Sequence, residues 1–168
     1  MIKRKNNTTP SYLELGAHLT GRVVPLCEVK DEVFAQKILG DGIAVVPAVG
    51  QLRAPADGRV EQVFDTAHAL TLLCDGGAEL LLHIGIDTVG LGGQYFRPLV
   101  KTGEVVKRGD ALISFDIDGI TAAGYDMTTP MVVSNTDDFE LQTLTSGNVM
   151  SGQPLLRLSR RKGGDGRE

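Results

Sequence analysis

The chain has 168 residues, of which 42% are hydrophobic and 23% are charged, and its formal net charge at pH 7 is −4. This length and composition predict one globular domain with a substantial apolar core. The acidic balance argues against nucleic acid as a partner, and no apolar run approaches the roughly 20 residues that a membrane-spanning helix needs. Two isolated cysteines and no evident signal peptide predict a cytoplasmic protein without disulfides.

The chain divides by composition into a central domain and two polar margins. Residues 1–19 begin with a basic, turn-rich stretch and are predicted to be a flexible N-terminal segment, in which His18 receives no role. Residues 20–158 are predicted to form the folded domain. The Gly-rich, charged residues 159–168 are predicted to be a disordered tail.

Two short helices are expected inside the domain. Residues 31–39 begin with acidic side chains, have a lysine near their end and precede Gly40, which is typical of a short helix. A second helical turn is expected near residues 117–124.

Short β-prone runs separated by Gly-rich turns make up the rest of the domain. They predict an all-β fold, an antiparallel β-sandwich of a duplicated hybrid or jelly-roll-like kind. A faint repeat supports the duplication, because residues 106–112 and 149–155 both match Val-x-x-Gly-x-x-Leu. Strands are expected at 22–27, 43–47, 58–64, 69–74, 79–84, 111–115, 130–134 and 154–158.

The most informative stretch is a predicted hairpin around Asp75-Gly76. Asp-Gly between two apolar runs is a strong signal for a two-residue turn, which would place His68 directly opposite His83. Their Cβ atoms would then lie about 4.5–5.5 Å apart. The same register places Thr66 opposite Gly85, and Phe64 opposite Asp87. A three-residue turn would instead make the two histidines diagonal neighbours.

Two imidazoles in contact within an apolar surround favour the neutral form, because a second positive charge beside the first is costly. A neutral imidazole has one unprotonated nitrogen. Three kinds of chemistry fit such a pair: nucleophilic catalysis through a phosphohistidine, a zinc site that uses His68, His83 and Asp87 with water as the fourth ligand, and general acid–base catalysis. The zinc hypothesis is weakened because no familiar metal-binding motif completes the site.

The residues around this hairpin resemble the active site of glucose-type enzyme IIA (EIIA type 1), a phosphocarrier of the bacterial phosphoenolpyruvate-dependent sugar phosphotransferase system. The resemblance rests on Leu-Leu-Leu-His-Ile-Gly-Ile-Asp-Thr-Val at 80–89 and Thr-Ala-His-Ala at 66–69. It covers roughly residues 20–158, in the family's order and spacing. Further matching segments are Asp-Glu-Val-Phe-Ala-Gln-Lys-Ile-Leu-Gly-Asp-Gly-Ile-Ala at 31–44, Ala-Pro-Ala-Asp-Gly at 54–58 and Thr-Pro-Met-Val-Val-Ser-Asn at 129–135.

The resemblance implies a role for each residue of the cluster. His83 would accept the phosphoryl group on Nε2, and its Nδ1 would be tethered to the main chain near Gly85. His68 would stabilise the phosphoryl oxygens, while Thr66 and Asp87 take the places of the family's hydroxyl and acidic neighbour. Because phosphoryl transfer depends mainly on positioning and charge stabilisation, no cofactor or resident metal is expected, and zinc would bind at most weakly at the two histidines.

The same resemblance implies protein partners. No phosphate-binding P-loop occurs in the sequence, so the phosphoryl group must come from another protein. The donor would be the histidine-containing phosphocarrier HPr, and the acceptor would be the IIB domain of a glucose-family sugar permease; the chain is expected to be a monomer. Both partners would dock on an apolar surface around the histidines. The residues predicted to form it are Val33, Phe34, Phe64, Leu70, Leu81, Gly85 and Val89.

Two alternatives of other classes remain open from the sequence. One is a zinc hydrolase that uses His68, His83 and Asp87, because some peptidases combine two histidines and an aspartate on a β-sandwich of this general kind. The other is a regulatory protein in which phosphorylation of His83 is a signal recognised by permeases or kinases. The second alternative would use the same surface as a phosphocarrier.

Overall fold

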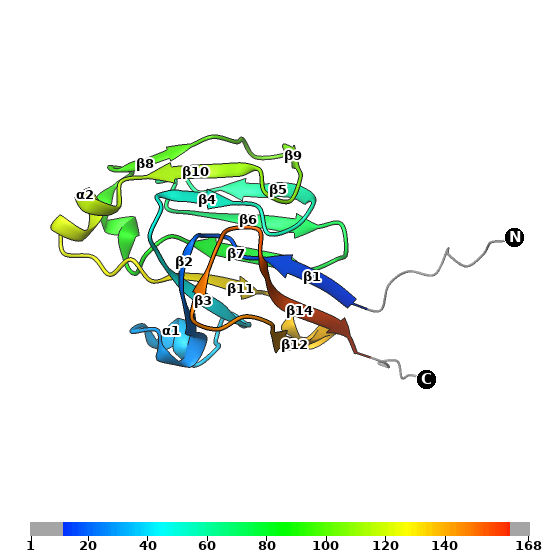
Figure 1. The fold of residues 1–168 in the computed structure, drawn as a ribbon. Coiled ribbons are helices and arrows are strands. Elements are labelled where there is room, and N and C mark those ends of the chain that lie inside the picture. Colours follow the sequence, from blue (N-terminus) through cyan, green and yellow to red (C-terminus); the bar gives the residue numbers. More distant parts are fainter. Residues whose placement is uncertain (1–11, 162–168) are drawn as a thin grey trace, which may run out of the picture.

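The protein is a sandwich of antiparallel sheets with two short α-helices, as shown by a computed structural model that describes residues 12–161 (Figure 1). The predicted all-β class and sandwich architecture are confirmed. All eight predicted strands are present within a few residues of their expected ends. No helix within residues 12–161 is long and apolar enough to cross a membrane.

The largest sheet has eight strands, and the predicted hairpin lies within it. The strand order is β13-β2-β3-β11-β7-β6-β5-β9, and every pairing is antiparallel. The hairpin strands β6 and β7 therefore have neighbours on both sides. The bounds are β13 (Asn148–Val149), β2 (Gly21–Pro25), β3 (Asp41–Pro47), β11 (Thr129–Val133), β7 (Glu79–His83), β6 (Ala69–Cys74), β5 (Gly58–Val63) and β9 (Val105–Val106).

Two three-stranded sheets pack against the large one. The first has the order β1-β14-β12, with bounds Tyr12–Gly16, Pro154–Arg160 and Phe139–Thr143. The second has the order β4-β10-β8, with bounds Gln51–Arg53, Ala111–Phe115 and Phe96–Pro98. The main core joins all three sheets and includes the fully buried side chains of Leu15, Leu52, Leu72, Leu112 and Leu158.

The sequence repeat corresponds to a repeated structural unit. In one copy β9 turns into β10, and the N–H of Gly109 donates to the carbonyl of Ala54 at 2.8 Å. In the other copy β13 turns into β14, and the N–H of Gly152 donates to the carbonyl of Ala17 at 2.9 Å. Both glycines have left-handed backbone, with φ values of 94° and 87°. The match in hydrogen bonding supports the predicted duplication.

A second, smaller apolar cluster holds α1 (Glu32–Ala35) next to the hairpin. Asp31 caps this helix by accepting a hydrogen bond from the N–H of Val33 at 2.9 Å. Phe34 is buried in the cluster, whose other buried members include Ile86 just after β7. The helix is shorter than predicted, because Lys37 adopts a left-handed backbone with φ 60°. The cluster therefore places α1 beside the end of β7.

The remaining short helices lie in the connections. The predicted second helix is present as α2 (Ile117–Ala122), which lies near the left edge of Figure 1. The 3-10 turns are η2 (Leu26–Glu28), η3 (Thr88–Leu91) and η4 (Thr136–Asp138). Of these, η3 directly follows the hairpin and is the one that bears on the site.

The structure differs from the prediction at both margins. Residues 12–19 are not a flexible segment, since β1 pairs with β14 and the side chains of Leu15, Ala17 and Leu19 are fully buried. At the other end β14 continues to Arg160, and the N–H of Arg161 donates to the carbonyl of Asp138 at 3.0 Å. The rest of the predicted flexible margins, residues 1–11 and 162–168, lies outside the described residues.

Candidate functional site

The hairpin between β6 and β7 has a three-residue loop, so the predicted two-residue turn is wrong. The N–H of Cys74 donates to the carbonyl of Ala78 at 2.9 Å, and Gly77, with φ 96°, occupies the left-handed position that closes such a loop. His83 is therefore paired with Ala69 rather than with His68. The carbonyl of His68 instead accepts the N–H of Ile84 at 2.8 Å.

The two imidazoles nevertheless meet. Their ring centroids lie 4.9 Å apart at an interplanar angle of 82°, an edge-to-face contact. The reason is a turn before β6: Ala67 has left-handed backbone with φ 57°, and its N–H donates to the carbonyl of Phe64 at 2.7 Å. Because His68 precedes the first residue of β6, it does not follow the alternation of the strand. The predicted contact between the two histidines is thus confirmed. The predicted strand register, with His68 directly opposite His83, is wrong.

His83 lies half-buried at the end of β7, with one ring nitrogen held by the main chain. Its Nδ1 lies 2.7 Å from the carbonyl oxygen of Gly85. Since a carbonyl only accepts, Nδ1 must carry the proton, and in the neutral ring the lone pair is left on Nε2. The predicted tether at Gly85 is therefore present. Phe34 of α1 packs edge-on against the same ring, with centroids 5.2 Å apart.

Burial lowers the pKa of His83 below its ordinary value of 6.5, although hydrogen bonds and nearby charges oppose the shift. The hydrogen bond to Gly85 raises the pKa, and so do the negative charges of Asp31 and Asp87. The neutral ring is thus favoured by burial, while the surrounding acceptors and charges stabilise a cationic ring when it forms.

His68 is more deeply buried, with 4% of its surface exposed. Its Nδ1 lies 2.5 Å from Oγ1 of Thr66, and the ring of Phe64 contacts it edge-on with centroids 5.6 Å apart. Burial lowers the pKa of His68 to about 4, and the neighbouring His83 lowers it further in the same direction. His68 is therefore neutral at physiological pH.

Two carboxylates flank this pair, of which the sequence identified one. Asp87 is exposed at the start of η3, with a left-handed backbone at φ 61°. Asp31 was interpreted as an acidic residue at a helix start, which it is, but its charge also acts on His83. No spacing in the sequence indicates this second role, because α1 reaches the hairpin only through the packing of Phe34.

The residues predicted to form the docking surface differ in their exposure. Val33 and Val89 are exposed, with 42% and 56% of their surfaces accessible, and Phe64 and Leu81 are half-buried. Leu70 is fully buried in the main core and cannot contact a partner.

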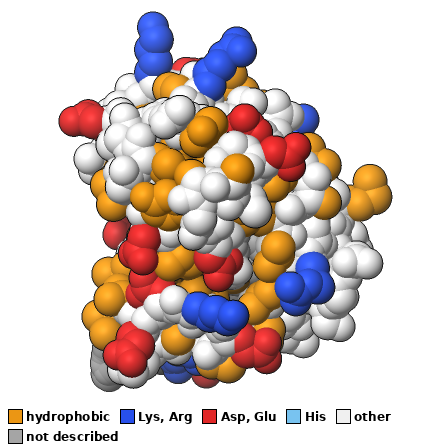
Figure 2. All heavy atoms as spheres, turned by 90° about the vertical axis from the view of Figure 1, so that its left-hand side faces the viewer, with side chains coloured by type: hydrophobic (Ala, Val, Ile, Leu, Met, Phe, Trp, Pro, Cys, Tyr) orange, Lys and Arg blue, Asp and Glu red, His pale blue; other side chains and the backbone are white. Residues whose placement is uncertain are grey.

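Two other predicted members of the docking surface, Phe34 and Gly85, are also buried. Both contact His83, Phe34 through its ring and Gly85 through its carbonyl. On the face that carries α1 and α2, hydrophobic side chains lie among acidic and basic ones (Figure 2).

The three-ligand zinc site is not assembled. Within residues 12–161, no group of three His, Cys, Asp or Glu side chains is arranged to hold a metal ion. His68 and His83 contact each other, but neither is joined by a carboxylate in such a group. The hydrolase alternative therefore lacks its catalytic centre in the described part of the chain.

Comparisons with known proteins show the family and the fold of this chain. The model of the family described as phosphoenolpyruvate-dependent sugar phosphotransferase system, EIIA 1, matches residues 13–139. The PTS system glucose-specific EIIA component of Oceanobacillus iheyensis is 44% identical over 145 residues, which cover 86% of this chain and 88% of that protein. The structure of glucose permease IIA from Mycoplasma capricolum is similar with a TM-score of 0.84 and 32% identity, covering 88% of this chain and 96% of the other.

One relative is much longer than this chain. The PTS system beta-glucoside-specific EIIBCA component of Dickeya chrysanthemi is 48% identical over 141 residues, or 83% of this chain. Those residues make up 22% of that protein.

Proposed function

We propose that this chain, which belongs to the EIIA 1 family of the phosphoenolpyruvate-dependent sugar phosphotransferase system, carries a phosphoryl group on Nε2 of His83. It receives this group from phospho-HPr in the cytoplasm and passes it to the IIB domain of a sugar permease. The observation that carries the proposal is the hydrogen bond from Nδ1 of His83 to Gly85, because it leaves the lone pair on Nε2.

Transfer from HPr is a displacement at phosphorus. The lone pair of Nε2 forms a nitrogen–phosphorus bond to His83, while the bond from phosphorus to the HPr histidine breaks and its electron pair returns to that nitrogen. The proton of His83 stays on Nδ1, which continues to donate its hydrogen bond to the carbonyl of Gly85. Transfer to IIB repeats the exchange, with Nε2 of His83 as the leaving group. Neither step requires a nucleotide, because the phosphoryl group comes from the histidine of HPr. The proteins contribute positioning and charge stabilisation.

His68 stabilises the transferred group in this proposal. If the hydroxyl of Thr66 donates to Nδ1 of His68, the proton of the neutral ring lies on Nε2. That N–H is then available to an oxygen of the phosphoryl group on the adjoining His83 ring, which lies 4.9 Å away between centroids. With the bond in this direction, Thr66 keeps the proton of His68 on Nε2.

Asp31 and Asp87 have the opposite effect on the phosphorylated state. Their charges raise the pKa of the His83 ring but repel phosphoryl oxygens. We assign them two tasks: to prevent the group from being held too tightly, and to attract a basic surface of the partner protein. The exposed Val33 and Val89 supply apolar contact area between these charges.

The proposal is tested by following labelled phosphate from phosphoenolpyruvate through enzyme I and HPr, with a metal chelator present. Wild type is expected to take up acid-labile label, and His83→Gln none. His68→Gln is expected to accept label but to pass it slowly to a IIB domain. The proposal fails if wild type takes up no label, or if His83→Gln takes up as much as wild type.

A further inference from the structure

The carbonyl that orients His83 belongs to a residue with an unusual backbone. Gly85 has φ +75°, and a Cβ at this position would lie 2.6 Å from Cγ2 of Thr88 and 3.0 Å from the carbonyl oxygen of Asp126. The position therefore requires glycine. Since Gly85 has no side chain to hold it, the direction of its carbonyl depends on the hydrogen bonds made by the neighbouring N–H groups.

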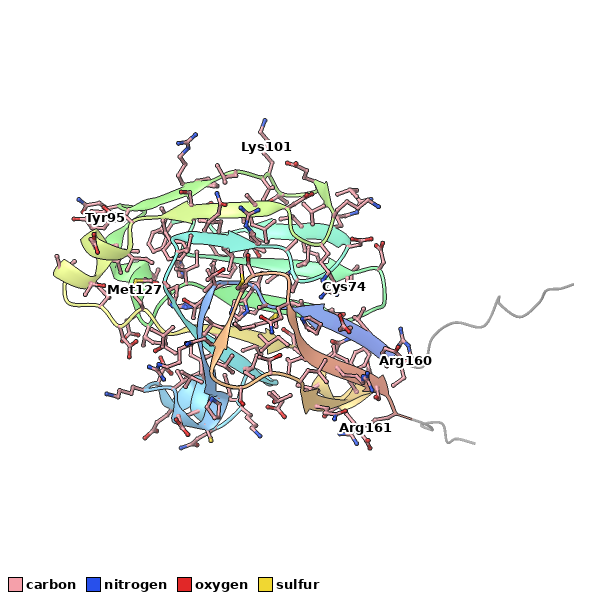
Figure 3. All side chains as sticks on the ribbon, viewed as in Figure 1. Cys74, Tyr95, Lys101, Met127, Arg160 and Arg161 are labelled. Carbon is pink, nitrogen blue, oxygen red and sulfur yellow. The ribbon has the colours of Figure 1, made fainter. Side chains whose placement is uncertain are left out.

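Both of those N–H groups are held by the segment that leads from α2 into β11, in which Met127 is labelled (Figure 3). The N–H of Gly85 donates to Oγ1 of Thr129 at 3.2 Å. The N–H of Ile86, which shares a peptide unit with the Gly85 carbonyl, donates to the carbonyl of Asp126 at 2.9 Å. Such chains of hydrogen bonds also strengthen the carbonyl as an acceptor.

Thr129 is the side chain in this arrangement, and its hydrogen bonds are complete. The residue is fully buried, and its hydroxyl donates to the carbonyl of Met127 at 2.7 Å. With the proton used in that direction, the lone pairs of Oγ1 are free to accept from Gly85. The carbonyl of Thr129 in turn accepts a hydrogen bond from Nε2 of the buried His18 at 2.9 Å. Both the hydroxyl and the main-chain carbonyl of Thr129 are thus held by hydrogen bonds.

We propose that Thr129 is a positioning residue for phosphoryl transfer: its hydroxyl holds Gly85 so that the proton of His83 stays on Nδ1 and the lone pair stays on Nε2. Thr129 does not touch the phosphoryl group and acts only through the main chain. This inference rests on the proposed function of His83, because the tautomer matters to transfer only if Nε2 is the phosphoryl acceptor.

The test removes the hydroxyl and measures the tautomer directly. Thr129→Val keeps the size and branching of the side chain but leaves the buried N–H of Gly85 without a partner. In the unphosphorylated protein, ¹⁵N NMR of the imidazoles is expected to show a population of His83 with its proton on Nε2. The rate of phosphoryl uptake from phospho-HPr is expected to fall about tenfold, since an unpaired buried donor is costly. Thr129→Ser is expected to retain both wild-type properties.

A neighbouring hydroxyl provides the matched control. Thr128→Val removes a buried hydroxyl that donates to Oδ1 of Asp126 at 2.7 Å, while the N–H of residue 128 keeps its bond to the same atom at 2.8 Å. In Thr128→Val, the tautomer of His83 and the rate of phosphoryl uptake are expected to match those of wild type. If Thr129→Val does not fold, Thr129→Ser and Thr129→Ala make the same comparison, because both lack the methyl group and only Ser keeps the hydroxyl.

Two results would overturn the role of Thr129: wild-type tautomer and rate in the variant without the hydroxyl, or an equal loss in Thr128→Val. Failure of the underlying function would appear differently. In that case wild type would accept no phosphate, while the NMR measurement would still show whether Thr129 controls the His83 tautomer.

Discussion

Replacement of the buried His18 is expected to weaken the dependence of stability on pH. His18 has no exposed surface, and within the described residues its Nδ1 has no hydrogen-bond partner. Burial lowers its pKa from 6.5 to about 4, with a smaller opposing effect of the hydrogen bond to Thr129. Between these two values the unfolded chain protonates His18, whereas the folded protein keeps it neutral.

The sign of the effect follows from this difference. Because the unfolded chain binds more protons between pH 6.5 and 4, the free energy of unfolding decreases as the pH falls through this window. At pH 5 the loss from His18 alone is about 2 kcal/mol, and above pH 7 it nearly vanishes. Burial and the neighbouring His83 lower the pKa of His68 to about 4, so its titration adds a loss of the same sign.

Urea unfolding at pH 7 and pH 5 measures this effect in wild type and His18→Gln. Glutamine keeps an N–H for the carbonyl of Thr129 but cannot be protonated in this range. Whatever its stability at pH 7, the variant is expected to lose about 2 kcal/mol less than wild type on going to pH 5. Comparison at each pH cancels the titration of all other groups. An equal loss in both proteins would refute the reasoning, since it would mean that folding does not change the pKa of His18.

Two further comparisons use pairs of matched positions. Gly85→Ala and Gly92→Ala both place a side chain on left-handed backbone, at a cost of about 1–2 kcal/mol each, but only the first overlaps Thr88, which adds about 1–3 kcal/mol. Urea unfolding should therefore separate the two, and only Gly85→Ala should slow phosphoryl uptake; equal stability and uptake would contradict this account of the Gly85 carbonyl. Leu70→Ala, in the core, should destabilise the protein by about 2–5 kcal/mol. Val89→Ala, on the surface, should leave stability within about 0.5 kcal/mol while raising the KM for phospho-HPr; the reverse pattern would restore Leu70 to the docking surface.

The sequence predicted elements that have a strong local signal. The eight predicted strands carry apolar runs bounded by turn residues, and both helices carry a polar start, so their existence did not depend on distant contacts. The strands that were missed, β4, β8, β9 and β13, have two or three residues, which is too short for alternation to be detected. β1 was missed for another reason: it is ordered by pairing with β14 at the far end of the chain. β12, which has five residues and pairs with the other side of β14, was missed as well.

The errors at the site came from backbone details that pairing rules do not contain. Asp75-Gly76 resembles a two-residue turn, but Gly77 takes the left-handed position and lengthens the loop by one residue. The histidine contact survived this error because the turn at Ala67 removes His68 from the strand alternation. The sequence predicts Leu70 on the docking surface as one of the apolar residues around the histidines, whereas the sheet directs it into the core.

The surroundings of His83 combine two opposing influences that suit the proposed role as a reversible phosphoryl carrier. Burial favours the neutral ring, which keeps Nε2 nucleophilic before transfer. The Gly85 carbonyl and the charges of Asp31 and Asp87 favour a ring that bears positive charge, as the ring does while phosphorus is bound to Nε2. The same two carboxylates repel the phosphoryl oxygens, so they stabilise the ring without stabilising the group it carries. Burial alone would leave the phosphorylated ring without a stabilising charge, and the negative charges alone would keep Nε2 protonated and unable to attack. The observed balance of the two supports the proposed carrier role of His83.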